Sequence, residues 1–308
     1  MRRPTYSIAH VAALESRALL SGNVLFQFSG GVLRLTGDNS NNQIAITQSV
    51  EGLQITALNG TKLGGVTNAT LIISNPTSTI IDLKGGDDTL NLEKYLGGSV
   101  NVLLGSGNDR LTMTSAVAEG AFTADLGSGN DTLLAAGTAD APNQASAVTL
   151  KASSGNDRLL IDQLSTTGKL DIDCSSGNDV LGLDHVRSTD IAKVDLGTGN
   201  DLMKVRYSVF NSSATLMGNT GDDIIGLLGN RFASLISIDL GNGKDGLLSE
   251  SNQMEANVSR LGGTGTDLSY KNLDTVAGTD TATGFETQTT TLTPAVIALV
   301  NKLNPAFA

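Results

Sequence analysis

The chain has 308 residues and a net charge of −11 at neutral pH, and it contains 36 glycines, no tryptophan and only seven phenylalanines. The negative charge argues against nucleic-acid binding, because that binding needs basic groups to neutralise phosphates. With so few aromatic side chains the core must be thin and aliphatic, yet a hydrophobic share of 39% is too high for a disordered chain.

The N-terminal segment MRRPTYSIAHVAALESRALLSG, numbered 1–22, is predicted to be an export leader or an N-terminal helix. The segment LESRALLSG, residues 14–22, resembles the LEPR-XLL leader at the start of many planctomycete secreted and surface proteins, with Ser16 where that family has proline. The resemblance implies export and an extracellular or cell-surface location. The alternative is a short amphipathic helix that covers one end of the domain. No stretch of about 20 apolar residues occurs, so no membrane span is predicted.

A Gly-Asp turn recurs along most of the chain, as in LLGSGNDRL, DLGSGNDTLL and DLGTGNDLM. The last aspartates of these turns are Asp88, Asp109, Asp131, Asp157, Asp179, Asp201, Asp223, Asp245 and Asp267. The steps in residue number between them are 21, 22, 26 and then 22 five times. A nearly constant period over nine units is typical of a solenoid. The one long step contains AAGTADAPNQASA, residues 135–147, which is predicted to be a surface loop.

Four segments follow from this repeat: residues 1–22 as leader or helix, 23–80 as degenerate N-terminal coils, 81–275 as the regular solenoid, and 276–308 as closing strand and capping helix. In the degenerate segment, Asn42 and Asn68 stand where the aspartate is expected. In the last segment, TLTPAVIALVNKLNPAF has the pattern of a helix that begins at Pro294. It is expected to cover the last coil, and the alternative is a docking segment for a partner or the cell envelope.

Strands are predicted on both sides of each turn, because apolar residues recur two and four positions after the aspartate. In the Asp179 unit these are Leu181 and Leu183, and Leu170, Ile172 and the lone Cys174 alternate before the turn. So short a unit has no room for a crossover helix, and each strand should therefore lie beside its equivalent one unit later. The predicted fold is an all-β, single-stranded parallel β-solenoid (β-helix) with about 22 residues per coil. We expect it to be right-handed, with short terminal helices. Val117, Leu164, Val186 and Val209 mark a third strand.

The turns resemble the RTX nonapeptide G-G-x-G-x-D-x-U-x, the hemolysin-type calcium-binding repeat of secreted proteins. GGTGTDLSY, residues 262–270, matches its Gly and Asp positions, and the asparagine before each aspartate is also similar. The resemblance implies that Ca²⁺ binds to the nine aspartates. RTX repeats follow without gaps, whereas here one nonapeptide occurs per coil, and Lys84, Ser153, Ser175 and Asn219 replace the second glycine in four units. These departures exclude metal on both edges and leave a single edge.

Two interpretations of the stacked aspartates stay open. A cation between coils would relieve the repulsion of carboxylates about 4.8 Å apart. Hydrogen bonds from local amides would relieve it too, and glycine and asparagine suit the tight turn without any metal. Asp82, Asp125, Asp173, Asp195 and Asp239, six residues before ladder aspartates, are expected to add charge to the same edge.

We expect no enzymatic activity, because the acidic residues follow the repeat and the only histidines are His10 and His185. The one irregular group is Lys204 and Arg206 beside Asp184 and His185. The predicted function is an exported structural, adhesive or surface solenoid with calcium ions as partners. Extracellular polysaccharide and envelope proteins are further candidate partners. The alternative is a parallel β-helix that binds or degrades polysaccharide.

Overall fold

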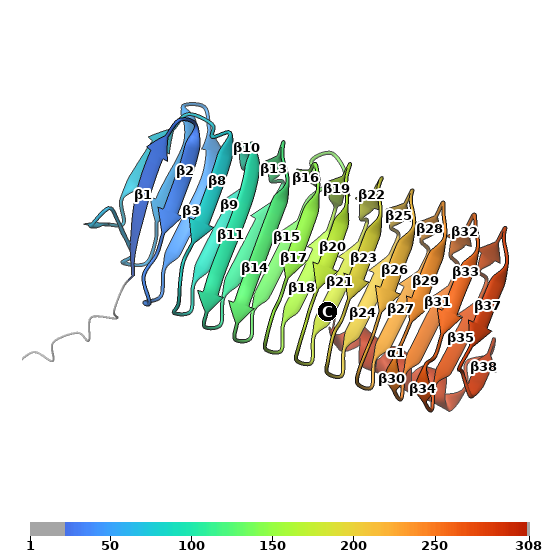
Figure 1. Cartoon of the computed structure of the whole chain (residues 1–308). Helices are drawn as coiled ribbons and strands as arrows, with labels where there is room; N and C mark the ends of the chain where they lie inside the picture. Colours follow the sequence, from blue (N-terminus) through green and yellow to red (C-terminus); the bar gives the residue numbers. More distant parts are fainter. Residues whose placement is uncertain (1–21, 307–308) are drawn as a thin grey trace, which may run out of the picture.

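The structure is a computed structural model that describes residues 22–306, so the predicted leader lies outside the described residues except for Gly22. Within this range a long stack of strand-built coils ends in one helix (Figure 1). The predicted fold class, an all-β parallel β-solenoid, is confirmed.

Three long sheets run along the stack, and each coil contributes one strand to each of them over most of its length. The first sheet holds the strands that precede the Gly-Asp turns: β1 (Asn23–Ser29), β2 (Val32–Thr36), β5 (Lys62–Leu63), β6 (Val66–Thr67), β8 (Ser78–Asp82), β11 (Ser99–Ser106), β14 (Phe122–Ser128), β17 (Val148–Lys151), β20 (Leu170–Asp173), β23 (Ala192–Asp195), β26 (Ala214–Met217), β29 (Ile236–Asp239), β33 (Val258–Leu261) and β37 (Asp280–Thr283).

The second sheet holds the strands that follow the turns: β3 (Gln43–Ser49), β4 (Gly52–Ala57), β7 (Thr70–Ile73), β9 (Thr89–Glu93), β12 (Arg110–Thr114), β15 (Thr132–Ala136), β18 (Arg158–Asp162), β21 (Val180–Asp184), β24 (Leu202–Arg206), β27 (Ile224–Leu228), β31 (Gly246–Glu250), β35 (Leu268–Asn272) and β38 (Thr287–Thr289). The third sheet holds short strands: β10 (Leu96–Gly97), β13 (Val117–Ala118), β16 (Asn143–Ala145), β19 (Leu164–Thr166), β22 (Arg187–Ser188), β25 (Val209–Phe210), β28 (Arg231–Phe232), β32 (Gln253–Met254) and β36 (Thr275–Val276). Two further strands, β30 (Asn242–Gly243) and β34 (Thr264–Gly265), pair at the turns.

Strand pairing follows the sequence repeat residue by residue. Leu181 pairs with Met203, and Met203 pairs with Ile225, so equivalent residues of successive coils lie side by side. The same inward positions therefore form columns along the stack, and these columns make one continuous aliphatic core. Cys174 is fully buried in it, as its place in the alternating pattern predicted.

The N-terminal end differs from the predicted pair of degenerate coils. Strands β2 and β3 form one coil below β8 and β9, and Asn42 takes the predicted ladder position. The rest folds back as antiparallel partners, β1 on β2 and β4 on β3. Asn68 lies between β6 and β7, away from the ladder, and accepts a hydrogen bond from Gly60 N–H. The hairpins cover an edge that a parallel stack would leave open.

The sequence suggested that helix α1 (Pro294–Ala306) covers the last coil. In the structure it does not cap the end of the stack. It runs back along the outer face of the second sheet and contacts β31, β27 and β24 (Figure 1). Val296 and Leu303 are buried there against Ile224, Leu248 and Tyr270. The reason lies in the outward positions of these coils, which are apolar or lack a side chain, as at Gly246 beside Leu299. Among residues 22–306, no helix has the length and apolar character to span a bilayer.

Substituting Val296 with aspartate is expected to detach the helix while the coils stay folded. A fully buried aliphatic side chain contributes about 1.5–3 kcal/mol, which is enough to release one short helix. Limited proteolysis should then cut near residues 290–306, with an unchanged circular-dichroism signal of the strands. Ile297→Asp is the matched control, because Ile297 is 46% exposed; equal protease sensitivity of the two variants would contradict this docking.

Candidate functional site

The Gly-Asp turns form one corner of the solenoid, between the first and second sheets. Two residues before each ladder aspartate the backbone has positive φ, as at Gly177 with φ of 133°. A Cβ on Gly177 would lie 1.5 Å from the carbonyl oxygen of Gly155 in the preceding coil, so only glycine fits. Lys84, Ser153, Ser175 and Asn219, which replace the second glycine, keep positive φ values of 66–79°. The turn geometry therefore persists where the sequence departs from the RTX pattern, at the cost of local strain.

The nine predicted aspartates lie in one continuous file on the inner side of this corner, which we call the inner ladder. Oδ1 of each aspartate accepts a hydrogen bond from the backbone N–H of the equivalent residue one coil earlier, as Asp179 does from Asp157 at 2.7 Å. All nine such bonds are 2.6–2.9 Å long. The structure thus brings all nine predicted residues together, in the order that the repeat implied.

The ends of the inner ladder use different residues. At the N-terminal end Asn42 donates its backbone N–H to Asp88 Oδ1 at 2.6 Å. At the C-terminal end the N–H of Asp267 donates to Glu286 Oε2 at 2.5 Å. Sequence reasoning missed Glu286, because the last coil is shorter than the regular ones and the glutamate falls out of register.

The second carboxylate oxygens of the inner ladder have no partner. Oδ2 of all nine aspartates is buried and receives no hydrogen bond from any described residue. The side chains are at most 2% exposed. Five residues before each aspartate stands a column of small or aliphatic residues that closes the interior beside it: Leu83, Leu104, Leu126, Ala152, Cys174, Leu196, Gly218, Leu240 and Gly262.

Burial changes the acidity of these carboxyl groups. Desolvation raises the pKa of Asp88 and Asp223 to about 8 and that of Asp179 to about 7. The backbone hydrogen bond from the preceding coil opposes this effect, and neighbouring carboxylates add to it. The pKa of Asp109, Asp157 and Asp201 rises to about 6 for the same main reason.

A second, exposed ladder runs beside the first on the outer side of the corner. Asn178 Oδ1 accepts from the N–H of Asn200, and Asn156 Oδ1 accepts from the N–H of Asn178, both at 2.7 Å. The side chain here bonds to the following coil, whereas the inner ladder bonds to the preceding one. The asparagines that looked like the RTX family are thus backbone-bonding residues in this structure.

The second file of aspartates predicted at this edge is less regular. Asp82, Asp125, Asp173 and Asp195 are half-buried and Asp239 is exposed, all at the outer face of the first sheet. Lys84 contacts Asp82, and Lys193 lies 3.1 Å from Asp195. The hydroxyls of Ser153 and Ser175 bond to Asp125 and Asp173. Four of these five carboxylates, those of Asp82, Asp125, Asp173 and Asp195, therefore have local partners.

The inner ladder leaves one carboxylate oxygen of each aspartate for a calcium ion. Calcium takes six to eight oxygen ligands from carboxylates, backbone carbonyls and waters. Here Oδ1 of each aspartate is occupied by an N–H, and only Oδ2 remains. Two neighbouring coils thus offer two unbonded carboxylate oxygens from aspartates that are at most 2% exposed.

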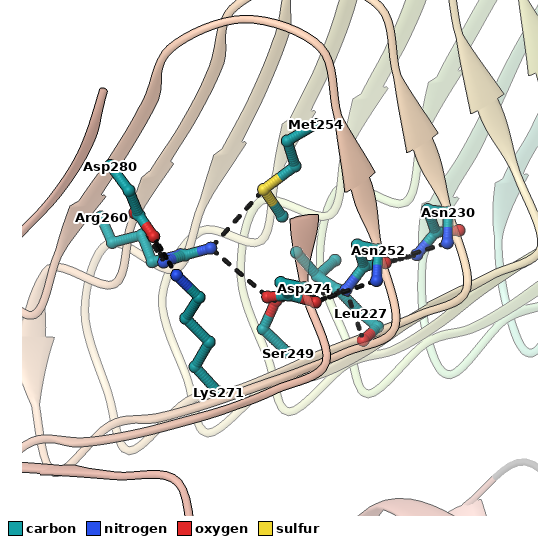
Figure 2. A network of polar contacts seen from close by, with 9 residues as sticks. All are labelled: Leu227, Asn230, Ser249, Asn252, Met254, Arg260, Lys271, Asp274 and Asp280. Atoms are coloured by element: carbon teal, nitrogen blue, oxygen red, sulfur yellow. Dashed lines mark hydrogen bonds and ion pairs between the residues drawn. The ribbon is translucent and has the colours of Figure 1, made fainter. Parts of the chain in front are cut away.

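A third ladder, unforeseen from the sequence, lies at another corner near the C-terminal end. Asn230 N–H donates to Asn252 Oδ1, and Asn252 N–H donates to Asp274 Oδ1, both at 2.9 Å. The amide nitrogens of the two asparagines also donate to the carbonyls of Val205 and Leu227. Figure 2 shows the bond from Asn252 to Leu227.

This ladder ends in a buried charge network. Arg260 occupies an inward position of β33, where Ile238 stands one coil earlier, and is only 2% exposed. Its guanidinium lies 3.4 Å from Asp274 Oδ2 and 2.6 Å from both oxygens of Asp280, which Lys271 also contacts (Figure 2). These ionic groups close the C-terminal end of the aliphatic core, where the sequence placed a helix. The signal was available in the sequence, as one arginine in an otherwise apolar column.

The irregular residues of the second sheet do meet. Asp162, Asp184 and Arg206 stand side by side on β18, β21 and β24, and Arg206 contacts Asp184. His185 Nδ1 lies 3.0 Å from Asp184 Oδ1 and 3.4 Å from Asp162 Oδ1. Lys204 instead donates to Asn304 Oδ1 of helix α1 at 2.9 Å. A groove of about 300 Å³ passes over this cluster, with Leu134 and Leu160 in its floor.

No protein-family model matches the chain, and neither a curated protein nor a solved structure is significantly similar to it. The assignment of function therefore depends on the residues and their geometry.

Proposed function

We propose that this chain is an exported, non-enzymatic rod with a structural or adhesive role at the cell surface or outside the cell. The observation that carries the proposal is the inner ladder, which links every coil from Asn42 to Asp267 by a side-chain bond in addition to the strand pairing. Such a device stiffens a long stack and leaves its lateral faces for contacts with envelope proteins or polysaccharide. Export is supported by the resemblance of residues 14–22 to a secretion leader.

Localisation in the source cells tests the proposal. An antibody against the solenoid should label the envelope or the medium after fractionation, together with a known surface marker. Exclusive recovery with a cytosolic marker would overturn the exported role.

A polysaccharide-binding or polysaccharide-degrading solenoid is the second candidate. The groove beside Asp162, Asp184 and Arg206 favours it, because it combines carboxylates and a guanidinium with an apolar floor at one place. Incubation with acidic and neutral polysaccharides should then retard the protein in affinity electrophoresis, and Arg206→Ala should abolish the retardation. Unsaturated or reducing products would indicate an enzyme. The absence of both retardation and products would exclude this candidate.

Calcium binding at the nine ladder aspartates stays a prediction, with a direct thermal test. A ligand that binds only the folded chain raises its melting temperature. Because Oδ1 of each ladder aspartate already accepts an N–H and the aspartates are at most 2% exposed, we expect the same melting temperature in millimolar calcium, in magnesium and in chelator. A rise that calcium produces and magnesium does not would restore the metal site.

A further inference from the structure

Asn42 reveals the hydrogen-bond polarity of the inner ladder. Its backbone N–H donates to Asp88 Oδ1, just as the N–H groups of the ladder aspartates donate to the next coil. Its side-chain nitrogen Nδ2 donates to the carbonyl oxygen of Ser40 at 2.7 Å and, at 3.2–3.4 Å, to Asp88 Oδ1 and to the carbonyl oxygens of Asp38 and Leu83. At this position Nδ2 is therefore a donor to backbone carbonyls, whereas Oδ1 is buried and receives no hydrogen bond from any described residue.

The aspartates place Oδ2 where Asn42 places Nδ2, as two matched glycines show. A Cβ on Gly37 would lie 2.8 Å from Asn42 Nδ2 and 2.5 Å from the carbonyl oxygen of Leu83. A Cβ on Gly218 would lie 2.7 Å from Asp223 Oδ2 and 2.4 Å from the carbonyl oxygen of Leu240. Gly37 and Gly218 stand five residues before their ladder residues, so the two sites are equivalent.

Carbonyl oxygens are available as acceptors in the aspartate coils. The residue equivalent to Ser40 is Gly107, Gly129 or Gly155, and no described backbone N–H donates to these carbonyls. An ionised Oδ2 would stay without a donor from the described residues, which is costly in a buried site.

The third ladder shows the same arrangement of donor and acceptor atoms. Asn230 and Asn252 donate Nδ2 to the carbonyls of Val205 and Leu227 at 2.9 and 3.1 Å. Its one aspartate, Asp274, receives donors on both oxygens, with Asn252 on Oδ1 and Ser249 and Arg260 on Oδ2. Both oxygens of this aspartate thus have donors, whereas Oδ2 of the inner-ladder aspartates has none among the described residues.

We infer that the aspartates of the inner ladder are neutral carboxylic acids in the folded protein, each with a proton on Oδ2 that is donated to a backbone carbonyl oxygen. Each proton neutralises its carboxyl group, so stacked negative charges do not arise along the inner ladder. Such a proton gives Oδ2 of each aspartate the donor role that Nδ2 has in Asn42, while Oδ1 accepts the N–H of the preceding coil.

The surrounding charges agree with this assignment. Ionisable groups near the ladder include the acids Asp38, Asp87, Asp125, Asp222 and Glu286 and the buried thiol of Cys174, while Arg110 and Arg158 follow Asp109 and Asp157 along the chain. The lysines of the same turns are exposed, Lys84 against Asp82 and Lys244 at the surface. Burial, the main cause, raises the pKa of the eight aspartates from Asp88 to Asp245 to about 6–8, and it also raises the pKa of Asp267.

Neutral aspartates in the inner ladder give the stability of the folded state a defined dependence on pH. In the unfolded chain an aspartate has a pKa of about 3.9, so between about pH 4 and the higher folded value only the folded state keeps the proton. As the pH rises across that window, each such carboxyl lowers the folding equilibrium constant about tenfold per pH unit. Its contribution is complete below about pH 4 and is lost as the pH rises toward about 6–8.

The experiment compares Asp179→Asn and Asp201→Asn with the unmodified protein at about pH 5 and about pH 8. Asparagine keeps the acceptor and supplies a permanent donor, so each variant should match the parent at low pH, exceed it in urea midpoint at high pH, and flatten the pH dependence. Asp140→Asn is the control, because Asp140 is exposed in the surface loop. This substitution should change neither the urea midpoint nor its pH dependence.

Carbon-13 NMR of aspartate-labelled protein provides a second measurement that does not depend on stability. Carboxyl signals that disappear in Asp179→Asn and Asp201→Asn should have the shift of a protonated acid at about pH 5. Ladder signals that are already ionised there, or asparagine variants that lose stability at both pH values, would overturn the inference.

Discussion

Replacing Asp179 by alanine is expected to lower the free energy of unfolding by about 2–3 kcal/mol at neutral pH. The change removes the acceptor of the Asp157 N–H and leaves that buried donor unpaired, which costs about 1–3 kcal/mol, and the lost carboxyl adds a small cavity. Chemical denaturation at constant pH measures the difference.

Asn178→Ala is the matched control for this substitution. Asn178 is the next residue along the chain, and its Oδ1 accepts from Asn200 N–H in the same way, but in the exposed outer ladder. Water can replace that bond, so the loss should stay below about 1 kcal/mol. Equal losses for both variants would show that burial of the inner ladder contributes nothing to its strength.

Replacing Arg260 by alanine is expected to cost about 3–5 kcal/mol, the range for removing one partner of a buried ion pair. The side chain of Asp274 is 0% exposed and would keep its charge with only neutral donors around it. Asp280 retains Lys271, so the damage should centre on Asp274. Urea unfolding and protease cleavage near residues 270–290 would both report the loosened end.

The double variant Arg260→Met with Asp274→Asn separates charge from packing. Methionine continues the apolar column of Ile238, and asparagine continues the ladder of Asn230 and Asn252. Much of the lost stability should return, because apolar replacement of a buried ion pair is often neutral or stabilising. A double variant as unstable as Arg260→Ala would show that the network acts by something other than its charge.

The position of the inner ladder could be predicted because it is set by a local repeat. A constant period stacks equivalent residues, and that stacking alone brings Asp88 and Asp267 into one file. The hydrogen bonds within the file depended on more than the period. Whether Oδ1 accepts from the preceding or the following coil follows from the side-chain orientation at the turn, and the inner and outer ladders differ in this although they are adjacent in sequence.

Both ends of the solenoid illustrate the limits of the pattern. Asn42 and Asn68 looked equivalent in sequence, yet only Asn42 joins the ladder, since β4 and β7 pair antiparallel and leave the winding. Helix α1 was recognisable from its apolar spacing. Its docking place depended on the outward residues of distant strands, including Gly226 and Gly246, whose missing side chains admit Leu303 and Leu299.

The sequence by itself determined the coil length, the parallel stacking, the aliphatic columns and the common corner of nine aspartates, because each of these follows from a period that every unit repeats. Only the tertiary structure decided which oxygen of each aspartate is bonded, how the two ends are closed and where the helix packs. These features depend on contacts between residues from different coils, and on the loss of water around them, which no single repeat records.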